Sequence, residues 1–551
     1  MTAAKTSTTR SLSPVRRFVK LVDEYYDQSF HRFPIAGSVA GRHEFDHALG
    51  RADPATWERQ AGLVEKTLAA VEDLPPQDFE ASRMLDRRAF LAHLRQERLE
   101  LVELTRWRND PQLHLFAAAE AIHDMVVRHS EDLSPVAEAI LSRLRKIPRF
   151  LDQAAECIHR PVPLWKQLTV SAAPAVGGMF KSLAGPLAAV TGKSPAMLAG
   201  VTRRAEQAAQ DYARVVNRAR PAAEGSFALG AERFTALMRE RLGLALSPRE
   251  AVAFARREAE RLAEALREEA RRFHPRNSPA EILDQAARQW KPRGKDLLEA
   301  YTRMTQRMRE RFEKADWLTF PQGDRLLVKP VPEFMRDQFP TAAYSSPGPL
   351  DPDQTGIFWV NDLSAAATTE RQRAGEVAQH FGLELTCAHE AYPGHHLQYI
   401  HQNRHPSLAR KMAHHAIYYE GWTLWCEQMT ADLPRRRADN PHLRLIQLHD
   451  ALWRAWRIVI DVGLQTGELT FEGACRVLQR EVGFTAARAR GDVNWYTSHP
   501  TVPMSYLLGK MEVLRLKHDR VDRGGMTLRE FNDWILSFGA IPWRWIEQSG
   551  L

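Results

Sequence analysis

Most of the chain repeats apolar residues at intervals of three and four positions, the spacing that places them along one face of an α-helix. This pattern runs from Pro14 to about Trp317, with Arg and Glu on the opposite faces, and returns from about Thr369 almost to the C-terminus. Ser247 and Glu250 mark a clear helix start, because a serine N-cap followed three residues later by glutamate forms a capping box. The pattern predicts a chain that is nearly all α.

The segment between Phe320 and Asp362 has a different pattern. Prolines interrupt it repeatedly, and Leu326–Val328 and Gly356–Val360 are short apolar runs rich in residues that favour strands. We expect a small antiparallel β element here. The predicted fold class is therefore mainly α, a large two-lobed helical fold with one small antiparallel β element.

The length of 551 residues exceeds the roughly 250–300 residues that a single hydrophobic core usually serves, so two lobes are expected. Residues 1–13 are small, polar and basic and are predicted to form a mobile tail. Residues 14–319 would form an N-terminal helical lobe. Residues 320–551 would form a second lobe with the β element, packed as one unit with the first.

Composition and charge exclude some classes of protein. With 44% hydrophobic and 26% charged residues, the chain has the composition of a folded globular protein rather than a disordered one. The 76 basic and 68 acidic residues give a net charge of +8, which is modest for this size. The tight basic triplet Arg435–Arg437 is interpreted as a solvated loop. We therefore expect no nucleic-acid partner, and the sequence favours no particular oligomeric state.

Cysteine usage and hydropathy predict a cytoplasmic protein with no membrane partner. The N-terminal residues lack the apolar core of a secretory signal. The least polar stretch, Ser171 to Val190, is interrupted by proline, glycine and lysine, so it would not span a bilayer. The cysteines are far apart and without CxxC spacing, which favours a reducing compartment. They are Cys157, Cys387, Cys426 and Cys475.

The most informative stretch begins with His389 and Glu390, which are adjacent as at the start of the zinc-binding HExxH motif. The second histidine of that motif would stand at position 393, where this chain has Pro393. On a straight helix His395 would point about 240° away from His389, and His396 would lie about 10.5 Å along the axis. Neither could then share a zinc ion with His389, because zinc–nitrogen bonds are only about 2.1 Å long.

Pro393 and Gly394 argue against a straight helix, because proline removes an intrahelical hydrogen bond and clashes with the preceding turn. A two-residue bulge would bring His395 to the position of the second ligand, whereas a three-residue bulge would bring His396 there. We favour His395, since it needs the smaller distortion. The remaining histidine would lie beside the site, holding the ligands or contacting substrate.

A third candidate ligand follows on the next predicted helix. Glu420 and Glu427 are seven residues apart and share one face, while most neighbouring positions are apolar or aromatic. A carboxylate in that setting should be paired or bind a metal. Glu420 follows His395 by 25 residues, enough for a turn and a second, antiparallel helix. The alternative is an ion pair with an arginine, His414 or His415.

These motifs resemble a large bacterial family catalogued as domain of unknown function 885, whose signature is HExYPGHHLQ. Residues His389–Gln398 read HEAYPGHHLQ, a complete match. Phe33–Asp46 resembles the opening of the family, Tyr419–Trp422 its second motif and Ser505–Lys510 its C-terminal motif. The family is in turn similar to all-helical zinc peptidases of the thimet oligopeptidase, carboxypeptidase Taq and angiotensin-converting enzyme type. In dipeptidyl peptidase III, a related precedent, an extra residue also lengthens the spacing between the histidines.

The resemblance implies a metallopeptidase-like fold in which residues 320–551 are the catalytic lobe. One zinc ion per chain would be held by His389, His395 and Glu420, leaving a fourth position for water. Glu390 would act as general base on that water. The candidates that would support the ligands from beside the site are His396 and Glu427.

A donor is also needed for the oxyanion that forms at the carbonyl. Tyr506 is the first candidate, and Tyr496 and His499 are reserve candidates for contact with substrate. The chain departs from the family pattern in this region, where an Arg-Tyr pair and a Pro-Gly run are expected. It has Trp495-Tyr496 and Pro500–Pro503 instead, which affects substrate choice more than the metal.

The favoured function is a zinc-dependent hydrolase of peptide or related amide bonds, with a peptide or small amide as its substrate. A catalytically inactive helical scaffold or binding protein is the first alternative. The intact His389, Glu390, His395 and Glu420 argue against it, whereas a missing Glu390 would have favoured it. The second alternative is a metal-dependent hydrolase of a non-peptide amide in secondary metabolism. The Gly356–Val360 strand would either line the cleft and pair with substrate or cover the core, and Tyr344 and Asn361 beside it are weaker candidates for substrate contact.

Overall fold

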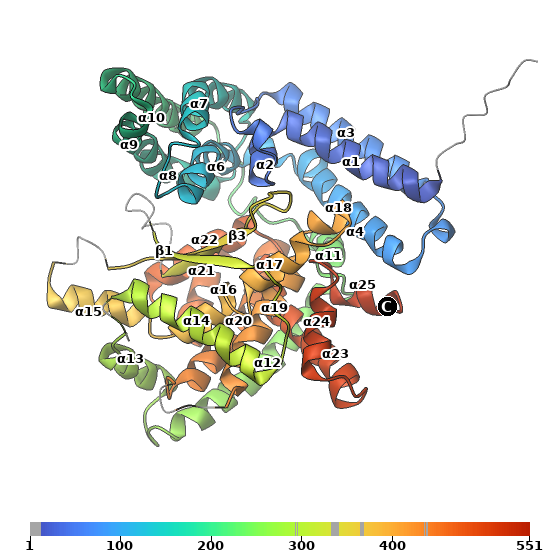
Figure 1. The fold of residues 1–551 in the computed structure, drawn as a ribbon, viewed down its shortest axis with the longest axis vertical. Coiled ribbons are helices and arrows are strands. Elements are labelled where there is room, and N and C mark those ends of the chain that lie inside the picture. The colour runs from blue at the N-terminus through green and yellow to red at the C-terminus, as the bar shows by residue number, and fades with distance from the viewer. Residues whose placement is uncertain are drawn as a thin grey trace, which may run out of the picture.

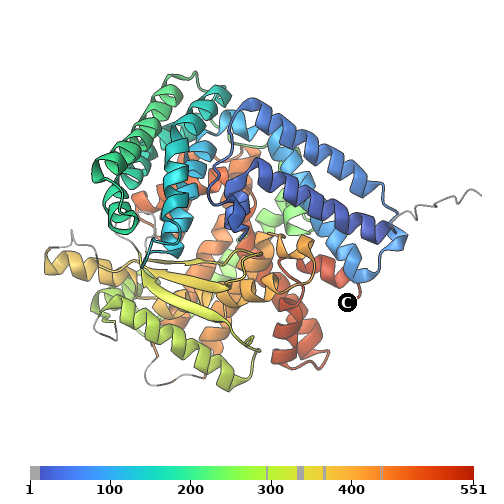
Figure 2. The same ribbon diagram turned by 45° about the horizontal axis from the view of Figure 1, so that its top comes forward.

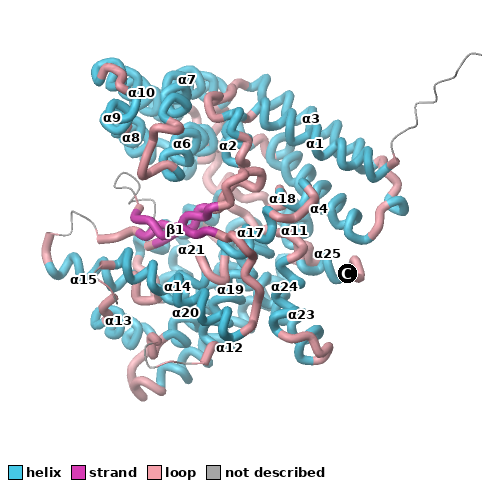
Figure 3. Tube along the Cα trace, viewed as in Figure 1, coloured by secondary structure: helices cyan, strands magenta, loops and turns pink. Residues whose placement is uncertain are grey.

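The computed structural model describes residues 13–292, 294, 296–331, 341–363, 368–434, 436 and 439–551. The predicted tail therefore lies outside the described residues except for Ser13, whose side chain caps the first helix. Two residues of the basic triplet, Arg435 and Arg437, also lie outside them, and Arg436 is exposed. Helices dominate the rest of the chain (Figure 3), so the prediction of a mainly α fold is confirmed.

The first part of the chain consists of helices joined by short connections. The capping box predicted at Ser247 and Glu250 is present at the start of α12. The helices are α1 (Pro14–Arg32), α2 (Pro34–Val39), α3 (Pro54–Glu72), α4 (Ala81–Arg98), α5 (Arg106–Asn109), α6 (Pro111–Arg128), α7 (Ala137–Cys157), α8 (Pro163–Ser182), α9 (Ala184–Thr191), α10 (Pro195–Arg218), α11 (Ala231–Leu242), α12 (Pro248–Arg271), α13 (Pro279–Gln289) and α14 (Leu297–Ala315).

Three strands follow, β1 (Arg325–Pro330), β2 (Ala342–Ser345) and β3 (Thr355–Val360), in the order β1-β3-β2. The two predicted strands are present, but the sheet is mixed rather than antiparallel. β3 pairs parallel with β1 and antiparallel with β2. The chain between β1 and β3 is long enough to return and enter β3 in the direction of β1, as parallel pairing requires. β3 is buried from Gly356 to Val360, as expected of a central strand covered on both faces.

The remaining helices carry the motifs that the sequence singled out. The interrupted His-Glu segment spans α16 and α17, and Glu420 lies on α19, which is buried along almost its whole length. These helices are α15 (Glu370–Gln379), α16 (Leu383–Glu390), α17 (His395–Asn403), α18 (Leu408–Lys411), α19 (Ala416–Asp432), α20 (Leu443–Thr466), α21 (Phe471–Val477), α22 (Ala486–Ser498), α23 (Val502–Lys517), α24 (Leu528–Leu536) and α25 (Trp543–Gln548).

The helices lie on two sides of the sheet. Figures 1 and 2 show α6 to α10 on one side, and α12, α14 and α20 on the other. The second side includes helices from before residue 319, because α12 shares an apolar core with α20 and α14 shares one with β3 and α16. The lobe boundary at residue 319 stays a prediction. Within the described part of the chain, no helix is both long enough and apolar enough to cross a membrane.

Candidate metal centre

The helix that carries His389 is broken rather than bulged. α16 ends at Glu390 and α17 begins at His395, and a Cβ on Gly394 would collide with the carbonyl oxygens of Ala388 and His389. Only glycine therefore fits at the start of the new helix. A bulge was expected to bring His395 close to His389. The break has the same effect, because it turns His395 toward His389.

Two contacts hold the broken segment in place. The indole Nε1 of Trp422 donates a hydrogen bond of 2.9 Å to the carbonyl oxygen of Pro393, which ties the segment to α19. On the other side, the hydroxyl of Tyr392 donates a hydrogen bond of 2.6 Å to Asp324, a carboxylate that Arg309 also binds at 2.7 Å. The position of His395 is thus fixed by the core as well as by its own helix.

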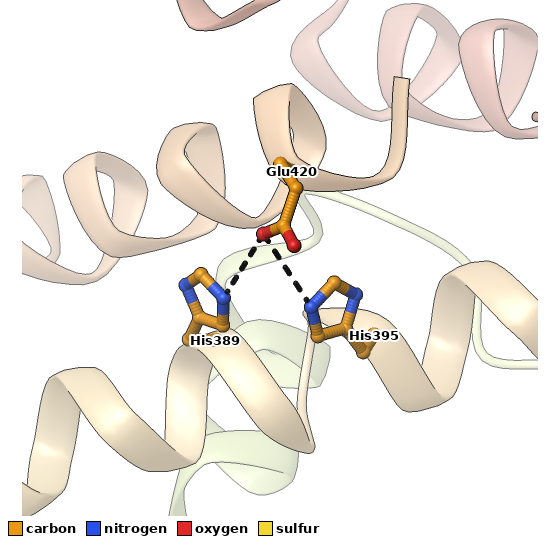
Figure 4. Close-up of side chains that lie close together, drawn as sticks. All are labelled: His389, His395 and Glu420. Atoms are coloured by element: carbon orange, nitrogen blue, oxygen red, sulfur yellow. Dashed lines mark ion pairs between the residues drawn. The ribbon is translucent and has the colours of Figure 1, made fainter. Parts of the chain in front are cut away.

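Three side chains from three helices converge at the break: His389, His395 and Glu420. Figure 4 shows both imidazole rings turned toward the carboxylate. Oε2 of Glu420 lies 3.4 Å from Nε2 of His389 and 3.7 Å from Nε2 of His395. Ligands about 2.1 Å from a tetrahedral zinc ion are about 3.4 Å from one another, so these separations match the edges of such a site.

The hydrogen bonding of the candidate ligands also fits a metal ion. Oε2 of Glu420 is buried and accepts no hydrogen bond from any described residue, and Nδ1 of His395 is likewise buried without a partner. A buried carboxylate oxygen without a hydrogen bond is costly. The alternative ion pair with His415 is not formed, because Nδ1 of that ring contacts the carbonyl oxygen of Arg241 at 3.1 Å. Two imidazoles and one glutamate are a donor set of catalytic zinc sites.

Electrostatics separate the two histidines. Burial would lower the pKa of His389, but the carboxylates of Glu420 and Glu427 raise it to about 10. Burial lowers the pKa of His395 to about 3. Burial would raise the pKa of Glu420, yet His389, His395 and the Tyr506 hydroxyl lower it to about 2. These shifts keep the Glu420 carboxylate ionised and the His395 imidazole neutral, the states in which both could bind a cation.

Glu427, which the sequence suggested as a support for the proposed ligands, contacts His389. Its Oε1 lies 2.8 Å from Nδ1 of His389, which leaves Nε2 of that ring facing Glu420. The guanidinium of Arg454 lies 3.7 Å from the same oxygen of Glu427. A carboxylate behind a histidine in this way fixes the tautomer and the orientation of the ring.

His396 does not point into the cluster. Its Nδ1 lies 3.0 Å from the hydroxyl of Tyr344 on β2, and its Nε2 lies 3.7 Å from Asp324. The sequence predicted that it would hold the ligands or contact substrate. The structure places it in the buried group around Asp324, and this group supports the break between α16 and α17.

Glu390, at the last turn of α16, lies close to the cluster. Burial, together with the charge of Glu420, raises its pKa to about 7, although His389 and the backbone of Tyr344 act in the opposite direction. The carboxyl group is thus close to balance between its two protonation states at neutral pH. That property suits a group which accepts and then returns a proton.

The three candidates from the late segments have different environments. The Tyr506 ring is 6.4 Å from the His389 ring and nearly parallel to it. Tyr496 is fully buried, with its hydroxyl donating to Asp492 and accepting from Trp453, so it packs away from the cluster. His499 stacks on Trp495 at 4.9 Å.

A cavity of about 470 Å³ reaches one member of the cluster, Glu420, although His389 and His395 are not among the residues that line it. This volume is typical of sites for small ligands. Residues from early and late helices line it together, among them Tyr26, His93, Arg241, Glu420, Trp495 and His499. A more apolar cavity of about 370 Å³ near α2 and α6 contains none of the candidate site residues.

Three residues that contact the candidate site or the segment supporting it were not recognised from the sequence. They are Asp324, Arg309 and Arg457. Asp324 and Arg309 act on the break from 65 or more residues away in the chain, and no local pattern reports that proximity. Arg457 on α20 stacks on the ring of Tyr506, with its Cζ 4.2 Å from the ring centre. In sequence it looks like one of many arginines on amphipathic helices.

Fold and site together define a mainly helical protein with a cluster of metal-ligand type on α16, α17 and α19. The chain belongs to the family described as bacterial protein of unknown function (DUF885), whose model matches residues 34–549. The resemblance noted from the HEAYPGHHLQ segment is confirmed at the level of the family.

Two solved structures share the fold. One, from Shewanella oneidensis, is described as a putative lipoprotein of unknown function; it has a TM-score of 0.76 and 18% identity, and the match covers 96% of this chain and 99% of that one. The other, described as the putative lipoprotein from Colwellia psychrerythraea, has a TM-score of 0.79 and 18% identity, over 98% and 99% of the two chains. At this identity the likeness shows the fold alone. No curated protein matches the chain.

Proposed function

We propose that this chain is a zinc-dependent hydrolase of peptide or related amide bonds. The observation that carries the proposal is the convergence of His389, His395 and Glu420, whose ligand atoms all lie within 4.8 Å of one another, beside a fourth ionisable group, Glu390. A zinc ion bound there would supply a Lewis acid and lower the pKa of a bound water molecule. The proposed similarity to the all-helical zinc peptidases rests on this donor set and on the adjacent glutamate.

Glu390 would act as the general base. Its pKa of about 7 lets the carboxylate accept a proton from water at neutral pH and pass that proton to the nitrogen of the leaving amine. Water adds to the carbonyl carbon in this reaction, and the carbon–nitrogen bond breaks. Glu427 would keep Nε2 of His389 directed at the cluster throughout.

Tyr506 would stabilise the oxyanion. Burial and the charge of Glu420 raise the pKa of its hydroxyl well above 10, so the hydroxyl stays protonated and remains a donor. It lies on α23, whose ring contact with His389 brings it to the cluster. A donor placed before the reaction needs no reorganisation when charge develops on the carbonyl oxygen.

The test is hydrolysis of a mixed peptide library by the full chain supplied with zinc, compared with Glu390→Gln. We expect turnover in the wild type and a loss of at least about 100-fold in Glu390→Gln, as for the removal of a general base. Glu268→Gln, an exposed position on α12, is the matched control and should retain activity. Equal activity of wild type and Glu390→Gln would contradict the proposal, and a wild type inactive on all amides would favour the scaffold.

A hydrolase of a non-peptide amide is the second candidate. Trp495 and His499 belong to the segment in which this chain departs from the family pattern, and both line the cavity. Substrate choice is therefore where this chain would differ from its relatives. Assaying small acylated amines next to peptides separates the two candidates, because the metal and the base are common to both.

The cytoplasmic location remains part of the proposal. All four cysteines are free and buried, which fits a reducing compartment. The description of the two structural neighbours as lipoproteins favours a location outside the cytoplasm. Detection of the chain in separated cytoplasmic and membrane fractions decides between them.

A further inference from the structure

A cavity of about 370 Å³ lies among the N-terminal helices, and it shares no lining residue with the cavity that reaches Glu420. Its volume is typical of sites for small ligands. Residues of α2, α3, α6 and α7 form most of its wall, and Pro349 and Met412 complete it. Leu113 and Glu120 on α6 are exposed, so the cavity is open to solvent along this helix. A ligand therefore has access to it.

The wall is mainly apolar and carries three aromatic rings, those of Phe33, Trp57 and Phe150. The centres of the first two rings are 4.9 Å apart. The indole Nε1 of Trp57 is buried and has no hydrogen-bond partner among the described residues, so this ring contributes apolar surface rather than a donor. Aromatic rings suit a flat apolar ligand, and their faces also attract a cation.

Helix α6 adds two hydrogen-bond acceptors to this wall, and the first is His114. Its Nε2 lies 2.8 Å from the carbonyl oxygen of Trp107, which places the ring proton on Nε2 and leaves Nδ1 as an acceptor. The residue is only 1% exposed, and burial lowers its pKa, so the ring is neutral at pH 7. Nδ1 has no hydrogen-bond partner among the described residues.

Glu120 is the second acceptor, and no cation compensates its charge. It forms no ion pair with another described residue, and burial and the charge of Asp124 both raise its pKa, whereas no basic group lowers it. Arg51 also lines the cavity, but its guanidinium already pairs with Asp53 at 2.5 Å. The cavity thus combines an apolar wall with two acceptors, one of them a carboxylate without a cation.

We propose that this cavity binds a small primary amine with an aromatic body. The ammonium group would donate to Glu120, and the ring of the ligand would lie against Phe33 and Trp57. A charged donor matches the cavity because His114 and Glu120 both accept hydrogen bonds, whereas Glu120 would repel a carboxylate. The amine is bound and not transformed, and the site does not depend on the proposed hydrolysis.

Binding is measured on the full chain stripped of metal with a chelator, so that an amine cannot coordinate an ion. The probes are phenethylamine, phenethyl alcohol and hydrocinnamate, which share the phenyl ring and differ in the polar group at the end of the side chain. Ligand-observed NMR titrations give their affinities. We expect the amine to bind at least about 10-fold more tightly than the alcohol, as for a charged hydrogen bond, and the acid to bind most weakly.

Glu120→Gln should lower the affinity for phenethylamine by about 10-fold and leave the affinity for phenethyl alcohol unchanged, because only the charge is removed. Retained binding of the alcohol shows that the variant is folded with its cavity intact. Asp124→Asn is the matched control. It removes a carboxylate one turn further along α6, which pairs with Arg128 at 3.2 Å and does not line the cavity. This variant should keep the preference for the amine.

Ala117→Phe tests whether the amine binds in this cavity. Ala117 lines the cavity between Leu113 and Glu120 on α6, so a phenyl ring there would occupy the space of the ligand. We expect neither the amine nor the alcohol to bind this variant, and thermal unfolding confirms that it is folded. Amine binding retained in Ala117→Phe, or a preference for the amine retained in Glu120→Gln, overturns the inference. Equal binding of the probes by the wild type, including no detectable binding of any, also overturns it.

Discussion

Gly421 on α19 and Gly509 on α23 meet backbone to backbone. A Cβ on Gly421 would lie 2.6 Å from Cα of Gly509, closer than any side-chain carbon approaches. The contact lies beside both Glu420, the preceding residue on α19, and Tyr506, one turn earlier on α23. It therefore sets the separation between a proposed metal ligand and the proposed oxyanion donor.

Gly421→Ala should destabilise the protein because a methyl group has no room between the two helices. We expect a loss of about 1–3 kcal/mol in the free energy of unfolding, typical of overpacking. Gly491→Ala on α22 is the control, because a Cβ there meets nothing within 4 Å. It should be neutral or stabilising by about 0.5–1 kcal/mol. Similar urea midpoints for the two variants would argue against a close helix contact.

Glu427→Gln should weaken metal binding without removing a ligand. The amide can no longer supply the charge that holds Nδ1 of His389 at 2.8 Å. Loss of such a partner typically costs 10- to 100-fold in metal affinity. Competition with a chromophoric chelator measures the effect, and Glu268→Gln provides the control. An affinity for zinc equal to that of the wild type would show that Glu427 has no part in the site.

Tyr506→Phe should slow turnover while leaving the zinc content unchanged. Removal of one oxyanion donor typically lowers kcat by about 10²–10³-fold. Tyr496→Phe is the matched control, because its hydroxyl bonds Asp492 and Trp453 within the core. That variant should lose stability rather than kcat. If both variants lose kcat to the same extent, the assignment of Tyr506 is wrong.

Stability should fall as the solution becomes acidic. Burial lowers the pKa of His380, whose Nδ1 contacts the Tyr301 hydroxyl, to about 4, from an ordinary value of about 6.5. As the pH falls, His380 therefore takes up a proton in the unfolded chain before it does so in the folded chain. Its contribution to the free energy of unfolding is constant above about pH 6.5 and is lost between there and about pH 4.

Urea unfolding of wild type and His380→Gln at pH 7.5, 6 and 5 isolates this contribution. As the pH falls, the free energy of unfolding of the wild type should decrease relative to that of His380→Gln, by about 1.4 kcal/mol for each pH unit between the two pKa values. Other titrating groups affect both proteins equally and cancel. A difference that stays constant across this range would show that His380 keeps its ordinary pKa.

Sequence patterns predicted those parts of the fold that depend on local preference. Helix periodicity and the Ser247–Glu250 capping box correspond directly to α12. The run Gly356–Val360 predicted β3, but β2 was missed because Ala342–Ser345 is short and lacks an apolar alternation. Strand direction was wrong for β1 and β3, since it depends on the path of the intervening chain, which hydropathy does not encode.

The candidate site, like the fold, was predictable from the sequence only where it depends on local structure. Helix geometry and the chemistry of Pro393 and Gly394 were enough to require an interruption and to select His395 as the residue near His389. The partner of His396 could not be predicted, because Asp324 lies 72 residues earlier and meets it only through the tertiary fold. Arg457 was missed because burial among aromatic rings is a property of the packed helices α20, α22 and α23.

Metal content is the most direct test of the central claim, that His389, His395 and Glu420 form a zinc site. Mass spectrometry on purified, zinc-supplied protein should find one zinc ion per chain in the wild type and in His396→Gln. It should find none in His389→Ala, His395→Ala and Glu420→Ala. A wild type that stays metal-free, or a His395→Ala variant that retains zinc while His396→Gln loses it, would contradict the assignment.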